Sequence, residues 1–289
     1  MQPSMDCAIA DLLQLLELEQ LEVNLFRGES RDVGSPQVFG GQVLGQALAA
    51  ASATVEGRIV HSLHAYFLRR GDFNAPIVYQ VDRSLDGRSF ANRRVVAIQH
   101  GEQIFNMAAS FQVLEAALDH QDEMPKVPPP EDLPDANSPP PEMVRHMPER
   151  LRRYFSQPRP FEFRLVPPTD SEQVRSGAPV RRIWFRACGD LPDDERLHRN
   201  ILAYASDFFL LGTATLHHAH VDGTLMLASL DHAMWFHRPL RVNDWLLYDM
   251  TSPSASGARG FSRASVFARE GRLVASTAQE GLVRLKRGA

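Results

Sequence analysis

The chain has 289 residues, of which 44% are hydrophobic and 23% charged, and its formal net charge is −4. These values are ordinary for a soluble globular protein with one large domain or two modest ones, and the negative charge gives no electrostatic reason to expect nucleic-acid binding. The only cysteines, Cys7 and Cys188, lie in different halves, which argues against a disulfide framework and excludes a cysteine-rich metal cluster.

The ends of the sequence predict a cytoplasmic protein without a membrane-inserted segment. Asp6 and Asp11 stand where a secretory signal would have a basic region followed by an apolar core. The two apolar helical segments, at residues 43–55 and 201–216, are both shorter than the roughly 20 residues that cross a bilayer. The terminal Lys286-Arg287-Gly288-Ala289 is not a Ser-Lys-Leu peroxisomal signal.

Hydrophobic periodicity predicts similar elements in the two halves of the chain. The first half reads as an amphipathic helix, a strand, an apolar helix and four strands, at residues 5–19, 24–28, 43–55, 61–68, 77–83, 89–99 and 104–113. The second half reads as a strand, an apolar helix and four strands, at residues 181–187, 197–216, 225–236, 245–251, 258–268 and 272–283.

Residues 119–180 interrupt this pattern. They contain 14 of the 20 prolines, and proline disfavours both helices and central strands because it removes a backbone donor. We expect a long linker over the surface, with one short helix at residues 142–155. The predicted domains are therefore 1–118 and 181–289.

The two halves also contain an internal repeat. His64 and His232 fall in one register, as do Arg70 and Arg238. The apolar helix before the first copy has no charged residue, whereas residues 201–216 contain one, Asp207. This pattern suggests a pseudo-dimer that keeps a single active site.

A helix that is apolar on every side must be enclosed. A curved antiparallel sheet around one helix would enclose it, so we predict an α+β fold: a double hot dog, with two antiparallel sheets each wrapped around a long central helix. Two unrelated α+β domains are the alternative interpretation.

Four motifs resemble those of the acyl-CoA thioesterase II family. They lie at residues 39–47, 61–69, 230–239 and 275–281. The similarity extends from about residue 10 to about residue 285. It implies hydrolysis of acyl-CoA thioesters, usually of medium to long chain, on a double hot dog without metal or organic cofactor.

The resemblance also implies a catalytic acid, hydroxyl and glutamine, which match Asp207, Ser229 and Gln279 in this chain. Many family members have threonine where this chain has Ser229. Serine keeps the hydroxyl but loses the methyl group that restricts its rotamers. The hypothesis is that the three side chains hold one water and that Asp207 takes its proton.

The residues by themselves leave other roles open for this set. Asp207 lies among apolar residues, where a charge costs several kcal/mol unless it is hydrogen-bonded. It could be a catalytic base, pair with an arginine or cap the helix. Gln279 and Ser229 lie on apolar strands and could equally be structural polar residues.

Several residues are candidates for binding acyl-CoA. Gly40 and Gly41 could bring backbone N–H groups to an oxyanion, or could only permit tight packing. The phosphates of coenzyme A favour arginines, for which the candidates near strand ends are Arg69, Arg88, Arg93, Arg259 and Arg263. The acyl groove could be lined by Phe208, Phe209, Met234 and Trp235, or these could be plain core.

Two other functions remain alternatives at this stage. An enoyl-CoA hydratase usually pairs its acid with a nearby histidine, and Asp207 has none in the next nine residues. A non-catalytic acyl-CoA-binding module would not require the full set of three polar residues. We expect no metal, since the histidines of residues 217–222 read as a polar loop. Exposed sheet edges favour a homodimer or homotetramer.

Overall fold

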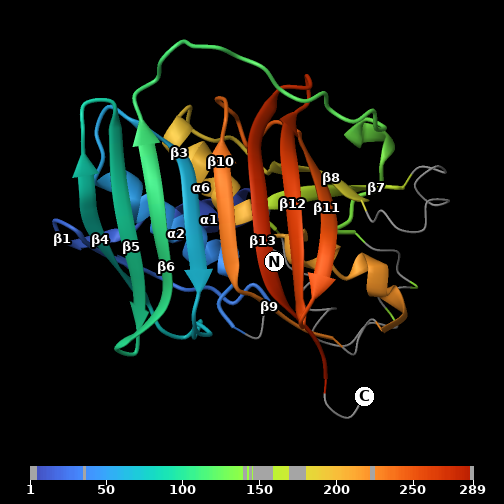
Figure 1. Ribbon diagram of the computed structural model, residues 1–289, viewed down its shortest axis with the longest axis horizontal. Helices are drawn as coiled ribbons and strands as arrows, with labels where there is room; N and C mark the ends of the chain where they lie inside the picture. Colours follow the sequence, from blue (N-terminus) through green and yellow to red (C-terminus); the bar gives the residue numbers. More distant parts are fainter. Residues whose placement is uncertain are drawn as a thin grey trace.

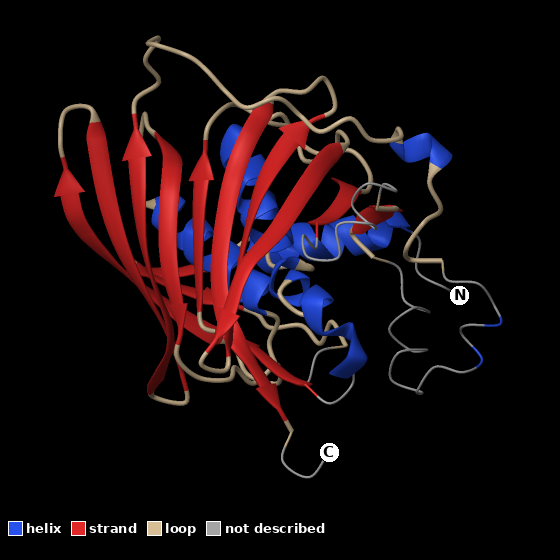
Figure 2. Ribbon diagram, turned by 45° about the vertical axis from the view of Figure 1, so that its right-hand side comes forward, coloured by secondary structure: helices blue, strands red, loops and turns tan. Residues whose placement is uncertain are grey.

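The computed structural model describes residues 5–34, 37–138, 142, 145, 159–168, 180–221 and 225–286. The sheet is antiparallel throughout and curves around the helices, which lie on one of its faces (Figures 1 and 2). The first half contains α1 (Met5–Leu16), β1 (Glu19–Glu22), β2 (Leu25–Gly28), α2 (Gly40–Ala53), β3 (Ile59–Phe67), β4 (Ile77–Asp86), β5 (Phe90–Gln99) and β6 (Glu102–Gln112).

The second half begins after a crossing segment that includes the short helix η1 (Pro130–Asp132). Its elements are β7 (Phe161–Val166), β8 (Val180–Ala187), α6 (Glu195–Ala205), α7 (Leu210–Thr213), η2 (Leu216–Val221), β9 (Leu225–Ser229), β10 (Asp231–Phe236), β11 (Leu246–Ser256), β12 (Arg259–Ala268) and β13 (Leu273–Leu285). Among the described residues, no helix has both the length and the apolar character needed to cross a bilayer.

The two half-sheets are joined into one. The strand order is β1-β2-β4-β5-β6-β3-β10-β13-β12-β11-β8-β7, with β9 also paired to β13, and the sheet has 13 strands. The expectation of two separate sheets is therefore wrong, because β3 of the first half pairs with β10 of the second. This pairing satisfies the backbone groups of two strands that would otherwise be open edges.

The repeat predicted from the sequence is displaced by one residue in the structure. Leu68 and Arg69 both donate their N–H groups to Ile104, just as His237 and Arg238 donate theirs to Val274. This shared irregularity makes Leu68 the counterpart of His237.

The counterpart of His232 is consequently Leu63, and the register of His64 with His232 is wrong. Side chains alternate between the two faces of a strand, so a shift of one residue in the alignment moves a side chain to the opposite face of the sheet. His64 is exposed on the outer face, whereas His232 is fully buried on the helix side of the sheet.

Helix α2 is enclosed as expected, and eleven of its residues are buried. Small side chains let it pack closely on α6. A Cβ added at Gly41 would lie only 2.2 Å from the carbonyl oxygen of Tyr204, and one at Gly45 would lie 3.2 Å from that of Asn200. The glycines at the start of α2 thus set the distance between the two helices.

The second apolar helix is not continuous, contrary to the prediction for residues 197–216. Helix α6 ends at Ala205, and Phe209 has a left-handed φ of 65° before the four-residue α7 begins. This conformation is uncommon for a bulky residue and redirects the chain. Asp207 therefore lies in the turn between two helices. The strand expected at residues 225–236 is likewise divided, at Leu230, into β9 and β10.

The predicted linker contains a strand of the sheet. β7 lies within the range 119–180 and pairs with β8, so this range is not a linker along its whole length. The segment after β6 crosses one end of the sheet to reach the far side (Figure 1). It is held there in part by the indole N–H of Trp184, which donates to the carbonyl oxygen of Pro128 at 2.9 Å. Most of the short helix expected at residues 142–155 falls outside the described residues.

The contact between α2 and α6 can be tested with Gly41→Ala. The new methyl group meets a backbone oxygen that cannot rotate away, and such overpacking costs roughly 1–3 kcal/mol. We expect thermal unfolding to shift down by several degrees. Gly212→Ala is the control, because its Cβ would meet only the flexible end of Arg181 at 3.1 Å. Equal unfolding temperatures for the two variants would contradict the close packing.

Candidate active site

The structure brings together Asp207, Ser229 and Gln279 from the α6–α7 turn, β9 and β13. Nε2 of Gln279 donates to Oδ1 of Asp207 at 2.8 Å and to Oγ of Ser229 at 3.1 Å. Because the strand breaks at Leu230, Ser229 is the last residue of β9, where it pairs with Gly281 of β13. Gln279 itself is completely buried, and its Oε1 has no hydrogen-bond partner among the described residues.

The first half contributes to this cluster through helix α2. The backbone N–H of Gly41 donates to Oδ2 of Asp207 at 3.0 Å. A helix N-terminus carries unpaired N–H groups and a partial positive charge, both of which favour a carboxylate. Gly41 was a candidate oxyanion donor from the sequence, but its N–H is occupied by Asp207.

Two opposing effects act on the acidity of Asp207. Burial raises the pKa of its carboxyl group, and this effect is the largest. Hydrogen bonds from Gln279, Gly41 and Ser229 lower the pKa in turn, in that order. The side chain is surrounded by protein but keeps part of its surface open to a cavity. The result is a carboxylate that is less acidic than usual and is held by three directed partners.

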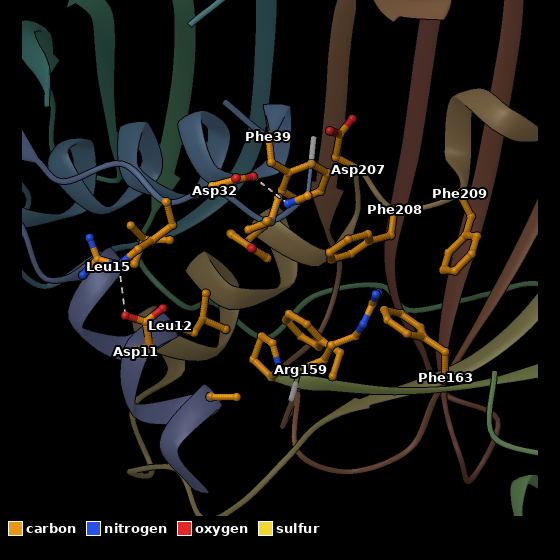
Figure 3. Close-up of a pocket in the computed structure, with 17 residues that line it drawn as sticks. Asp11, Leu12, Leu15, Asp32, Phe39, Arg159, Phe163, Asp207, Phe208 and Phe209 are labelled. Carbon is orange, nitrogen blue, oxygen red and sulfur yellow. Dashed lines mark hydrogen bonds and ion pairs between the residues drawn. The ribbon is translucent and has the colours of Figure 1, made fainter. Parts of the chain in front are cut away.

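A cavity of about 490 Å³ opens beside Asp207. Helix α1 with Asp11, Leu12 and Leu15 forms one side, and Asp207, Phe208 and Phe209 lie across from it (Figure 3). Further aromatic rings line this cavity, from Phe39, Phe161, Phe163 and Tyr204. Because its walls are mostly apolar and aromatic, the cavity suits a hydrophobic ligand.

A second cavity, of about 200 Å³, reaches the cluster from another direction. Its lining includes Gly40, Ser229, Arg69 and Arg70. Gly40 separates it from Asp207, since a Cβ at Gly40 would lie 2.7 Å from Oδ2 of that residue. The polar cluster therefore lies between an aromatic cavity and a smaller cavity that carries two arginines.

The other arginine candidates lie elsewhere. Arg93 is fully buried and bonds to Thr54 and Asp86, so it is a structural residue and the prediction that it contacts a ligand is wrong. Arg259 pairs with Glu280 at 2.9 Å and lines a different cavity. Arg88 and Arg263 are exposed, in the β4–β5 turn and on β12.

The aromatic candidates divide in the same way. Phe208 and Phe209 line the large cavity. Met234 is fully buried in the core, and Trp235 points to the outer face of the sheet, where its ring packs edge-on against His64. Trp235 is thus wrongly predicted as part of a groove.

One residue close to the cluster was not predicted from the sequence. His232 is fully buried, and its Nδ1 lies 3.3 Å from Nε2 of Gln279. The alternation of His232, Met234 and Phe236 along β10 could have indicated that it faces inward. No group of three or more potential metal-ligating side chains occurs in the described part of the chain.

Comparison with known proteins shows the family. A family model described as "Acyl-CoA thioesterase N-terminal domain" matches residues 28–112, and one described as "Acyl-CoA thioesterase" matches residues 155–282. "Acyl-CoA thioesterase 2" of Haemophilus influenzae is 42% identical over 95% of this chain and 97% of its own length. The chain belongs to the acyl-CoA thioesterase II family. It is accordingly a thioester hydrolase.

Human "Acyl-coenzyme A thioesterase 8" is 41% identical over 94% of this chain and 88% of that protein. Among solved structures, the acyl-CoA thioesterase II TesB2 of Mycobacterium marinum has a TM-score of 0.80 at 44% identity, covering 96% of this chain and 99% of that one. A hot dog protein from Alicyclobacillus acidocaldarius has a TM-score of 0.75 at 20% identity, covering 94% of this chain and 97% of that one. The last likeness supports the hot dog fold alone.

The raised pKa of Asp207 predicts the pH dependence of the enzyme. In the hypothesis that Asp207 is the general base, it must be deprotonated to accept a proton, so activity should fall as pH drops through the pKa of this carboxyl group. Since burial raises that pKa above the ordinary 3.8, we expect kcat/KM to decline at a midpoint above pH 3.8. Circular dichroism over the same range separates this effect from acid unfolding. A midpoint at or below 3.8 in folded enzyme would contradict the assignment.

Proposed function

We propose that the enzyme hydrolyses medium- to long-chain fatty acyl-CoA to free fatty acid and CoA, using one water held by Asp207, Ser229 and Gln279. The single observation that carries this proposal is the position of the cluster. A carboxylate bonded to a buried amide lines the aromatic cavity, and the hydroxyl bonded to the same amide lines the smaller cavity that carries two arginines. The three side chains offer the acceptors and donors that orienting a water requires.

The chemistry follows from the groups available. Asp207 accepts a proton from the water as the water oxygen attacks the thioester carbonyl carbon. The tetrahedral intermediate then collapses, the carbon–sulfur bond breaks, and the CoA thiolate leaves and takes up a proton. The N–H of Gly40, which has no partner within the helix because it is the first residue of α2, is the candidate donor to the carbonyl oxygen. Gly41 acts instead on Asp207.

The two cavities suggest how the substrate lies. The acyl chain would occupy the aromatic cavity beside α1, where each buried CH2 contributes about 0.8 kcal/mol. Coenzyme A would extend past the smaller cavity, where Arg69 and Arg70 meet its phosphates. Arg69 now pairs with Glu102 at 2.7 Å, and this exposed ion pair can be exchanged for a phosphate at low cost. The thioester would then lie at the cluster between the cavities.

The catalytic role of the carboxylate is tested by Asp207→Asn. Removing a general base typically costs a factor of about 10²–10⁴, and we expect kcat to fall in that range. Release of CoA thiol from octanoyl-CoA, followed with a thiol reagent, measures it. Asp231→Asn is the matched control, because burial also raises the pKa of Asp231, yet its bond is to the backbone N–H of Glu280. Near-normal turnover by Asp207→Asn would refute the proposal.

The acyl site is tested by Ala8→Phe. Ala8 lines the large cavity from α1, which lies across from Asp207. A ring there shortens the space for the chain, so kcat/KM should drop about fourfold for each methylene displaced, the factor that 0.8 kcal/mol corresponds to. We expect a large loss for C12–C16 substrates and little change for C4–C6. Ala10→Phe, exposed on the same helix, should leave the profile unchanged. An unaltered profile for Ala8→Phe would place the chain elsewhere.

The remaining expectations go beyond what membership of the family implies. We propose that each half of the chain is one hot dog unit and that the enzyme works in the cytoplasm as a homodimer or homotetramer; these stay predictions. Enoyl-CoA hydration would need an acid–histidine pair, and His232 contacts Gln279 and not Asp207. Comparing crotonyl-CoA hydration with octanoyl-CoA hydrolysis distinguishes the two reactions.

A further inference from the structure

His232 is an uncharged histidine in the core, next to the proposed catalytic cluster. It is fully buried on β10, and burial lowers its pKa to about 3. Its Nε2 lies 2.9 Å from Oγ of Ser206, and its Nδ1 lies 3.3 Å from Nε2 of Gln279. It therefore links the end of helix α6 to the glutamine of the catalytic cluster.

The proton on this ring can be assigned from its neighbours. The hydroxyl of Ser206 donates its only proton to the carbonyl oxygen of Ala203 at 2.8 Å. Towards His232 it can then only accept, so Nε2 of the ring must carry the proton. A neutral imidazole has one proton, which leaves Nδ1 as a bare acceptor facing Gln279.

This acceptor is one of three that face the NH2 group of Gln279. The two N–H protons are shared among Asp207 at 2.8 Å, Ser229 at 3.1 Å and Nδ1 of His232 at 3.3 Å. All three acceptors favour the NH2 end of the amide over its oxygen at this position. The flipped amide would place its oxygen 2.8 Å from the Asp207 carboxylate and near a second lone pair, which is repulsive. Flipping would also leave Asp207 without one of the hydrogen bonds that lower its pKa.

Ser206 is itself held in place. Tyr248 donates its hydroxyl proton to the backbone oxygen of Ser206 at 2.7 Å, and its oxygen lies 3.0 Å from Oγ1 of Thr277. Tyr248 and Thr277 are both buried. The serine that sets the ring tautomer is thus fixed by a hydrogen-bonded anchor on β11 and β13.

The first half of the chain provides an internal comparison. Leu63 is the counterpart of His232 and lies opposite Ala109. Continuing the pairing of Ala233 with Ala278 by one residue places Gln279 opposite His232, so Ala109 is the counterpart of Gln279. The histidine and glutamine occur together in the half that carries Asp207, while the other half has an apolar pair that is buried equally well. The fold itself does not require the polar pair.

We propose that His232, with its tautomer set by Ser206, is a positioning residue that holds the Gln279 amide in the orientation that catalysis requires. This inference rests on the proposed function of Gln279. His232 does not touch the substrate or take up a proton in the reaction. Its effect is exerted through the amide, and therefore on turnover and not on substrate binding.

The decisive variant is His232→Leu, because leucine already occupies the equivalent buried position in the first half. We expect kcat to fall at least about tenfold, because a misplaced group can cost up to about 10² in rate, while KM changes less than about twofold. His232→Asn places an amide oxygen where Nδ1 was and should restore part of kcat. Ser206→Ala removes the hydroxyl that fixes the His232 tautomer, so it should lower kcat to a smaller extent. It tests the same role without changing His232 itself.

A double-mutant cycle separates positioning from general destabilisation. In a Gln279→Ala background, His232→Leu has no amide left to orient, so it should change kcat less than about twofold. His237→Leu is the control, since His237 is exposed directly after β10 and contacts Ser276; it should keep wild-type kcat. Thermal unfolding of each variant shows that it is folded.

The outcomes distinguish this inference from the proposed function. If Gln279→Ala keeps its kcat, the catalytic cluster is wrong and the positioning role falls with it. If Gln279→Ala is impaired but folded His232→Leu is not, only the positioning role is overturned. The positioning role is also overturned if the kcat losses of the two single variants multiply in the double variant.

Discussion

The structure of the active site depends on keeping one carboxylate ionised away from water. Asp207 is enclosed in the turn between α6 and α7, and burial alone would favour its neutral form. The N–H of Gly41 and the amide of Gln279 offset part of that cost. One of these partners comes from the first half of the chain and the other from the second. The hydrogen bonds of Asp207 therefore require both halves in contact, although only one half carries this residue.

This dependence explains the division of work between two similar halves. The first half supplies the start of α2, whose glycines bring a backbone N–H to Asp207 and allow the helix to approach Tyr204. Leu63 and Ala109 fill its equivalents of the His232 and Gln279 positions with apolar side chains. The β3–β10 pairing fixes the halves in register. A second complete site would need another charge buried at the same cost.

The arrangement of cavities suggests why chemistry and selectivity can be adjusted separately. The cluster lies between an aromatic cavity closed by α1 and a smaller one bordered by Arg69 and Arg70. Residues of α1 lie across the large cavity from Asp207 (Figure 3). In the proposed placement of the substrate, changes in that helix would alter the space for the acyl chain and leave Asp207, Ser229 and Gln279 in place. The network from Tyr248 through Ser206 and His232 supports the cluster from the opposite side, within the core.

The sequence by itself determined the class of elements, the enclosed helix α2 and the family, because hydrophobic periodicity and local motifs are encoded in adjacent residues. It also singled out Asp207, Ser229 and Gln279, which the structure brings into one hydrogen-bonded cluster. It did not determine the break after α6, the single sheet, or the true counterpart of His232. Periodicity does not reveal a left-handed residue such as Phe209, and an error of one residue in a strand register reverses the face on which a side chain lies. Only tertiary structure decided which donors reach Asp207, since Gly41 and Gln279 are separated from it by 166 and 72 residues. Contacts at that separation depend on how the whole chain packs, and no local pattern records them.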